Sequence, residues 1–212
     1  MSILQDLIVA GQYEQVEERL AYHPQEARTI GLYNLFSQKS RCYPIHYICR
    51  RQNVPQSTMR ALLNASPVEA FVFRESATWS TPLHVACWYQ LPASTLALLV
   101  HRQPRALHLI DRDGSLPVHL TASLHPEASK LVPIFLAFYP ETATRQNRKE
   151  QTPLKLLKAR KDLAVLVEDI LRQAMDGKAD HQPLSPTKGM ARGSLPSKNI
   201  VSLKLFSRKK FR

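Results

Sequence analysis

Three histidines recur along the chain at nearly constant spacing, and imidazole rings can bind a metal ion or transfer protons. They are His46, His84 and His119. Each stands two residues after a proline, which favours a helix start because the first turn leaves the N–H that proline lacks unbonded anyway. Three separate helix starts would keep the rings apart by roughly the 10 Å spacing of packed helices. We therefore predict a structural role for each histidine and no metal site.

Other residues that could do chemistry also fit structural roles. Cys42 and Cys49 have no second cysteine pair with which to form a zinc site. Asp111 and Asp113 could carry out acid–base chemistry, but they precede Gly114, and aspartate favours such turns by bonding its own backbone. The sequence has no glycine-rich phosphate loop, nucleophile elbow or His-Glu-x-x-His motif. We expect neither an enzyme nor a bound cofactor.

The elements that carry these residues repeat along the sequence. The prolines that open the repeated segments are Pro44, Pro82, Pro117 and Pro153, separated by 38, 35 and 36 residues. A fixed period of this size is typical of stacked-repeat proteins.

A second set of prolines recurs with a similar period, at Pro67, Pro104 and Pro140. Apolar residues at helical spacing precede each of them. These stripes are Met59, Leu62 and Leu63, then Leu96, Leu99 and Val100, then Val132, Phe135 and Leu136. Each unit is therefore predicted to contain a short helix, a turn, a longer helix and an extended loop.

Helix caps are predicted from the hydroxyl residues of these units. Ser57-Thr58 and Ser94-Thr95 each follow a proline and are expected to cap the longer helices. Thr81 is expected to cap the short helix that begins at Pro82.

Residues 81–87, Thr-Pro-Leu-His-Val-Ala-Cys, resemble the signature of the ankyrin repeat, which includes Thr-Pro-Leu-His followed by small residues. Residues 111–119 resemble that family's finger turn and the helix start after it. The sequence departs from the pattern at Tyr43 and Leu116, which replace the threonine, and at Lys155, which replaces the histidine. The resemblance implies an all-α, ankyrin-like helical-repeat solenoid of about four to five repeats with extended finger loops, and composition adds a disordered tail.

The two registers divide the chain into a repeat domain, residues 1–175, and a basic tail, residues 176–212. We expect an N-terminal cap at 3–27, repeats at about 43–79, 80–114 and 115–150, and a C-terminal cap at 151–174. Within the N-terminal cap, Ala10-Gly11-Gln12 is expected to break the helix.

The resemblance also implies a binding face, because finger tips and the exposed side of the first helices form the concave face of ankyrin-like folds. Arg and aromatic side chains dominate interface hot spots. The candidate partner-binding residues are Arg50, Arg51, Arg74, Trp79, Trp88, Tyr89, Arg112, Arg145 and Arg148, with Ser123, Leu124 and Lys149 beside them. We expect a monomeric, non-catalytic interaction module or adaptor for an acidic or mixed protein partner. The open alternative is that Trp88 and Tyr89 only fill space between neighbouring helices.

The tail is strongly basic. Nine Lys or Arg residues against two Asp give it +7 of the formal net charge of +12. High net charge with low apolar content predicts disorder. An alternative function is an accessory factor whose tail binds nucleic acid or an anionic membrane surface. Ser185 begins a Ser-Pro-x-Lys pattern and is a candidate phosphorylation site.

The sequence also favours a cellular location. No run approaches the roughly 20 apolar residues of a membrane span. The first residues lack the basic start and apolar block of a secretory signal. Three cysteines without paired spacing favour a reducing environment. We expect an intracellular protein of the cytoplasm or nucleus.

Overall fold

The computed structural model describes residues 2–35 and 38–160. This part is mostly helical, as the sequence predicts. Its α-helices are α1 (Ile3–Ala10), α2 (Tyr13–Tyr22), α3 (Pro44–Ile48), α4 (Gln56–Ala65), α5 (Pro82–Trp88), α6 (Ala93–Arg102), α7 (Pro117–Leu124), α8 (Ala128–Phe138) and α9 (Pro153–Lys158). Short 3-10 helices follow the longer helices: η1 (Pro24–Arg28), η2 (Val68–Phe71), η3 (Pro104–His108) and η4 (Pro140–Thr144).

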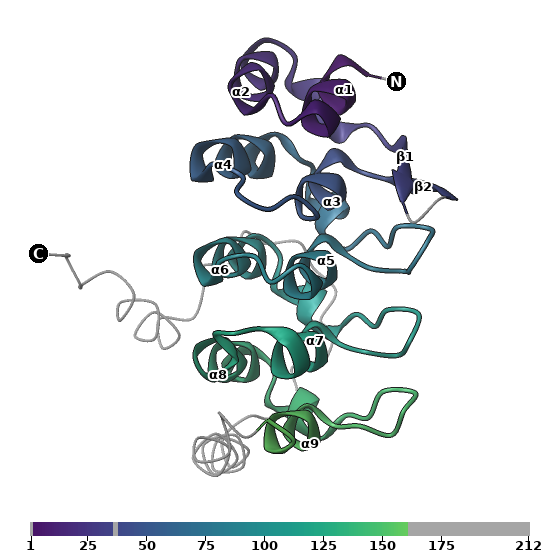
Figure 1. Cartoon of the computed structure of the whole chain (residues 1–212), viewed down its shortest axis with the longest axis vertical. Helices are drawn as coiled ribbons and strands as arrows, with labels where there is room; N and C mark the ends of the chain where they lie inside the picture. Colours follow the sequence, from purple (N-terminus) through teal and green to yellow (C-terminus); the bar gives the residue numbers. More distant parts are fainter. Residues whose placement is uncertain (1, 36–37, 161–212) are drawn as a thin grey trace, which may run out of the picture.

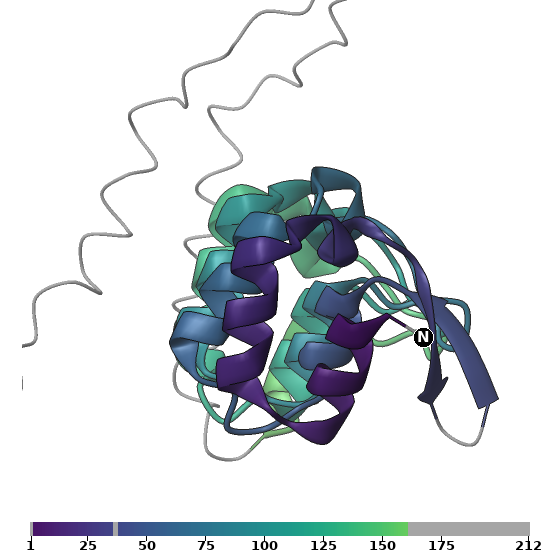
Figure 2. The same cartoon turned by 90° about the horizontal axis from the view of Figure 1, so that it is seen from above.

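The helices form layers that lie in sequence order along the long axis (Figure 1). Each of the first four layers is a helix pair, α1 with α2, α3 with α4, α5 with α6 and α7 with α8, and α9 begins the next layer. Helices of neighbouring layers contact one another, as α5 and α9 do on either side of α7. Seen from above, the layers overlie one another and their connecting loops project to one side (Figure 2).

The core between the two helix columns includes the apolar stripes. All nine stripe residues of α4, α6 and α8 are buried, which confirms that prediction. Burying one such side chain stabilises the fold by about 1.5–3 kcal/mol. Cys49, directly after α3, and Cys87 on α5 occupy equivalent buried positions, where small side chains let neighbouring layers approach closely.

Gly11 ends α1 where the sequence predicts a break. Its φ of 73° lies in the left-handed region, which glycine adopts without a steric penalty. Its backbone N–H bonds back to the carbonyl oxygens of Leu7 and Ile8. The chain therefore reverses within two residues and α2 packs beside α1.

The predicted caps of the longer helices are wrong, although the cap at Thr81 is confirmed. Pro55 and Pro92 are the capping residues of α4 and α6, and neither helix start has a side-chain cap bond. The helices begin early because a proline just before the first turn sets the backbone for it. Ser57 and Thr58 instead donate to the carboxylate of Glu17 on α2, which joins the first two layers.

The layers are connected through four loops, which we call finger 1 (29–43), finger 2 (72–81), finger 3 (109–116) and finger 4 (145–152). Finger 1 contains an antiparallel hairpin of β1 (Gly31–Leu35) and β2 (Gln38–Cys42), in which Gly31 pairs with Cys42 and Tyr33 with Ser40. This small sheet departs from the all-α prediction. It forms because the Tyr33 ring is buried against Tyr47 of α3, with ring centroids 4.7 Å apart.

Fingers 2 to 4 share one turn geometry. A polar side chain near the start of each turn accepts a hydrogen bond from the backbone N–H two residues later. These side chains are Glu75, Asp111 and Asn147, with donor–acceptor distances of 3.0, 2.9 and 2.9 Å. A residue with positive φ follows in each finger: Trp79 at 58°, Gly114 at 70° and Glu150 at 55°. The fingers are therefore ordered turns.

Consecutive fingers are joined by backbone hydrogen bonds, which we call the inter-finger bonds. Ser76 donates to the carbonyl oxygen of Arg41 at 3.4 Å, and Arg112 donates to that of Thr78 at 3.0 Å. Arg148 donates to the carbonyl oxygen of Asp113, also at 3.0 Å. These bonds fix the position of each finger relative to the one before it.

Some sequence-based expectations fall outside the described residues. They are the second helix of the C-terminal cap, the basic tail 176–212 and Ser185. Across residues 2–35 and 38–160, none of the helices combines the length and apolar content that crossing a bilayer requires.

Candidate partner-binding face

His84 joins the start of α5 to finger 3. Its Nε2 donates to the carbonyl oxygen of Ser115 at 3.1 Å, and the Thr81 hydroxyl lies 2.8 Å from its Nδ1. Thr81 Oγ1 also accepts from the backbone N–H of His84, which completes a capping box. The ring is fully buried, and burial lowers the pKa of His84 to about 4. The imidazole is therefore neutral at pH 7 and serves as a bridge between two elements.

The other two recurrent histidines make the same link in the neighbouring layers. His46 Nε2 lies 2.9 Å from the carbonyl oxygen of Phe73 in finger 2. His119 Nε2 lies 3.0 Å from the carbonyl oxygens of Arg145 and Gln151 in finger 4. Each ring thus belongs to its own layer. Within the described ranges, no group of three His, Cys, Asp or Glu side chains is arranged to hold a metal ion.

The bridge of His46 differs from that of His84 at the second ring nitrogen. Nδ1 of His46 is buried without a hydrogen-bond partner. Tyr43 stands at the position that Thr81 occupies one layer on, and so no short hydroxyl is available to Nδ1. The Tyr43 ring instead packs edge-on against Phe73, with centroids 5.3 Å apart.

Glu75 is a buried carboxylate that sequence reasoning missed. It accepts hydrogen bonds from the Ser40 hydroxyl and from the backbone N–H groups of Ala77 and Thr78, and it forms a 3.1 Å ion pair with Arg50. Burial raises its pKa, but the hydrogen bonds and the Arg50 guanidinium outweigh burial and hold the pKa of Glu75 below its usual range. This cluster fastens finger 1, finger 2 and α3 together.

A sequence signal for Glu75 exists in the finger period. Glu75 stands 36 residues before Asp111, and Asp111 stands 36 residues before Asn147. Asp111 uses its carboxylate in the same way, accepting from the backbone of Asp113 and Ser115. This confirms that the turn accounts for Asp111. An alignment of the finger sequences by their period would have identified Glu75 as the equivalent of Asp111 and Asn147.

A groove of about 180 Å³ opens between finger 2, α5, finger 3 and α7. We call it the Trp88 groove, because the Trp88 side chain at its edge is 54% exposed. Val85 and Leu120 contribute apolar lining, and Arg112 contributes an exposed cation. The groove brings together four of the sequence-predicted residues: Arg50, Trp88, Tyr89 and Arg112.

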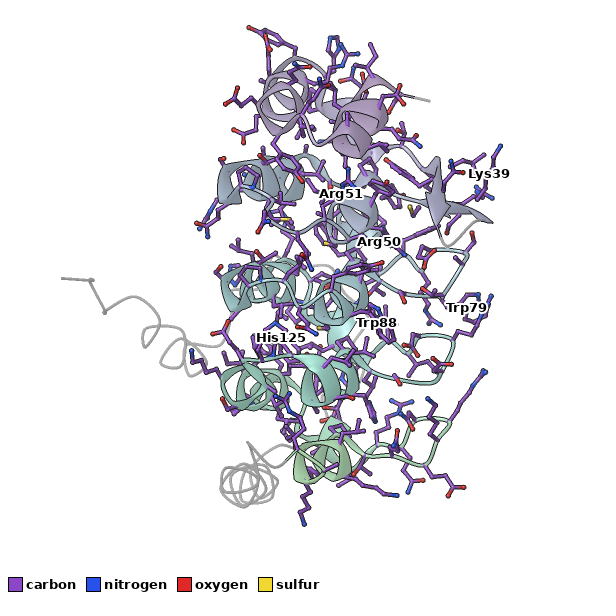
Figure 3. All side chains as sticks on the ribbon, viewed as in Figure 1. Lys39, Arg50, Arg51, Trp79, Trp88 and His125 are labelled. Atoms are coloured by element: carbon purple, nitrogen blue, oxygen red, sulfur yellow. The ribbon has the colours of Figure 1, made fainter. Side chains whose placement is uncertain are left out.

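Trp88 and Tyr89 also line a second hollow, of about 440 Å³, between the helix–helix turns of two layers. Tyr89 is half-buried and packs against the core, in line with the space-filling alternative for this residue. Trp88, by contrast, is exposed, so the space-filling alternative does not account for this residue. Figure 3 shows Arg50, Arg51 and Trp88 beside the helices, whereas Lys39 and Trp79 lie on the fingers.

Two of the predicted arginines have structural partners. Arg50 is nearly buried, since its ion pair with Glu75 leaves its side chain 8% exposed. Arg51 donates to the carbonyl oxygen of Val9 and lies over the Tyr47 ring, 5.8 Å from its centroid. Both arginines therefore hold layers together, and neither presents a freely exposed guanidinium.

Apart from Ser123 and Leu124, the remaining predicted residues lie on the fingers. Arg74 lies over the Trp79 ring, 5.8 Å from its centroid. Trp79 is 53% exposed. Arg112, Arg145, Arg148 and Lys149 are exposed. Ser123 and Leu124 lie at the end of α7, the serine exposed and the leucine half-buried.

His125 is a second residue that sequence reasoning missed. It is buried, and its Nε2 lies 2.9 Å from the carbonyl oxygen of Leu91 in the previous layer (Figure 3). Its Nδ1 accepts from the backbone N–H of Glu127. The ring thus ties the turn before α8 to the turn before α6.

Comparison with known proteins gives no family assignment. No protein-family model matches the chain, and no curated protein matches it in sequence.

Proposed function

We propose that this chain is a non-catalytic protein-interaction module built from ankyrin-like stacked repeats. Its partner is an acidic or mixed protein segment that lies along the face formed by the fingers and the first helices. The observation that carries the proposal is the Trp88 groove, because it combines a half-exposed indole, apolar lining and an exposed arginine. Trp and Arg are the residues most enriched among interface hot spots.

The surroundings of the groove support tight binding by a rigid surface. His84 fixes finger 3 against α5, and the Glu75 cluster fixes finger 2 against α3. A wall that is already ordered loses little conformational entropy when a partner binds. An apolar side chain of the partner would enter beside Trp88, and an adjacent carboxylate would pair with Arg112.

Two tryptophans of equal exposure provide a matched test. Trp88 lies in the groove and Trp79 lies on a finger, at 54% and 53% exposure. We expect Trp88→Ala to lose the main partners in affinity purification with mass spectrometry, while Trp79→Asn retains them. Asparagine suits position 79 because it tolerates positive φ. Retention of the same partners by Trp88→Ala, with an unchanged circular dichroism melt, would remove the basis of the proposal.

A second candidate function rests on the composition of residues 176–212. Their net charge of +7 favours an accessory factor that contacts nucleic acid or anionic membrane through the tail. Replacing the nine basic tail residues by Gln in the full chain tests this function. Loss of partner binding in that variant, together with retention in Trp88→Ala, would favour the tail over the groove.

The proposal includes a monomer acting in the cytoplasm or nucleus. Cys42, Cys49 and Cys87 are all buried and unpaired, which suits a reducing compartment.

A further inference from the structure

The fingers carry a row of cations, of which the Trp88 groove uses only Arg112. The cations are Lys39 and Arg41 on finger 1, Arg74 on finger 2, Arg112 on finger 3, and Arg145, Arg148 and Lys149 on finger 4. All are exposed except Arg74, which is half-exposed against Trp79. We call this row the finger edge.

No cation of the finger edge lies within ion-pair distance of a carboxylate in the part of the chain that the structure describes. The same fingers contain four carboxylates, two of which are engaged internally. Glu75 pairs with Arg50, and Asp111 accepts from backbone N–H groups. Asp113 and Glu150 are exposed, and neither forms an ion pair with a cation among the residues that the structure describes. The accessible charge of the finger edge is therefore predominantly positive.

The finger edge is also held in register by the backbone. The inter-finger bonds involve the main chain of Arg41, Arg112 and Arg148 themselves. Fingers 1, 3 and 4 thus each place an arginine beside the bond that joins them to a neighbouring finger. The side chains start from fixed positions along the long axis, one after another, and this arrangement suits a linear partner with repeated negative charge.

Trp79 gives this row an aromatic face. Its backbone has a φ of 58°, and a 3.0 Å bond from its N–H to the carbonyl oxygen of Glu75 holds the turn. The indole is about half exposed, with the Arg74 guanidinium over it. A flat ring next to cations is the combination on which single-stranded nucleic acids bind, because phosphates pair with the cations and a base stacks on the ring.

We infer that the finger edge binds single-stranded nucleic acid, with Arg41, Arg112 and Arg148 on phosphates and Trp79 stacked against a base. An acidic peptide fits this edge less well, since the apolar lining that would anchor it lies in the Trp88 groove. The inference goes beyond the proposed protein-binding function, and Arg112 is the residue that this site shares with the Trp88 groove.

The test uses the full chain and a fluorescein-labelled oligothymidylate of about 20 nucleotides, longer than the roughly 4–16 nucleotides that one single-strand-binding fold covers. Arg112→Gln/Arg148→Gln removes two finger-edge charges. Arg60→Gln/Arg102→Gln is the matched control, because these exposed arginines lie on α4 and α6, away from the fingers. Every variant keeps the basic tail, so the contribution of the tail to oligonucleotide binding is the same in all of them.

Fluorescence anisotropy should show the finger variant binding at least about tenfold more weakly at 50 mM salt than the unaltered chain. The slope of log affinity against log salt should fall by about 1.4, or about 0.7 for each lost phosphate contact. The control should lose the same net charge with little change in slope. Equal losses in both variants, or no binding by the unaltered chain, would overturn the inference.

Substitutions at Trp79 distinguish binding of nucleic acid from binding of an acidic peptide. Trp79→Asn should weaken oligothymidylate binding by about fivefold or more without changing the salt slope, whereas Trp79→Tyr should retain it. A labelled polyglutamate peptide should bind weakly and show no dependence on Trp79. Peptide binding as tight as that of the oligonucleotide, with Trp79→Asn affecting neither, would assign the edge to acidic proteins and refute the nucleic-acid site.

Discussion

Nε2 of His84 lies 3.1 Å from the carbonyl oxygen of Ser115, so the helix start of one layer holds the finger that leads into the next. A substitution at His84 therefore affects two layers. Ala at this position would leave a buried carbonyl oxygen and the Thr81 cap without their partner, and each such group costs about 1–3 kcal/mol.

We expect His84→Ala to lower the free energy of unfolding by about 2–4 kcal/mol. Urea denaturation followed by circular dichroism measures the change. His101→Ala is the matched control, because His101 is exposed on α6, and it should stay within about 0.5 kcal/mol of the unaltered chain. Similar values for the two variants would contradict the bridging role of His84.

The buried histidines make stability depend on pH. Burial lowers the pKa of His46 and His84 from 6.5 to about 4, so between these values the unfolded chain binds protons that the native chain does not. Stability should be fully present above about pH 6.5 and should fall as pH drops toward 4. Urea midpoints measured at several pH values across this window check the direction. A midpoint that stays constant or rises from pH 6.5 to 4.5 would be inconsistent with neutral, buried rings.

Glu75 should be among the positions of the fingers at which substitution destabilises the protein most. Glu75→Gln leaves the Arg50 guanidinium buried without a counter-charge, which typically costs about 3–5 kcal/mol. Denaturant unfolding should show this loss, and the exposed Glu69→Gln should show almost none. The double variant Arg50→Gln/Glu75→Gln should recover part of the stability. If the double variant were as unstable as the sum of the single variants, the pair would not be coupled.

Two glycines have similar backbone angles but different surroundings, so replacing each by alanine distinguishes backbone strain from steric contact of the added Cβ. Gly11 and Gly114 have φ of 73° and 70°, so alanine at either position costs about 1 kcal/mol through the backbone. An added Cβ meets nothing within 4 Å at Gly11, but at Gly114 it lies 3.1 Å from Arg148 Cγ and 3.2 Å from Arg148 N. Thermal melts should therefore rank Gly114→Ala as the less stable variant. The reverse order would mean that finger 4 moves aside freely.

Much of the helical part could be predicted from the sequence, because its signals are local. Leu96, Leu99 and Val100 lie on one side of the chain only if it forms a helix, and Pro82 marks where the preceding helix begins. The capping contact of Thr81 follows from residues three positions apart. Such patterns depend only on residues that lie close together in the sequence.

The candidate site was less predictable, because its decisive contacts are distant in sequence. Arg50 resembles a surface residue until Glu75, 25 residues away, is found to pair with it. Ser40 reaches Glu75 from 35 residues away. The hairpin of finger 1 was missed for a similar reason, since Tyr33 is fixed by packing on Tyr47 and its own segment has no strong strand pattern.

The inter-finger bonds restrict how the length of this protein can change. An extra residue in finger 3 would displace Arg112 or Asp113 and so interrupt hydrogen bonds to finger 2 or finger 4. The turns between paired helices have no backbone–backbone hydrogen bonds from layer to layer in the part of the protein that the structure describes, and are joined there through side chains such as those of His125 and Arg51. An insertion in those turns that leaves Arg51 and His125 in place should be tolerated, whereas an insertion of equal size in a finger should separate the neighbouring units.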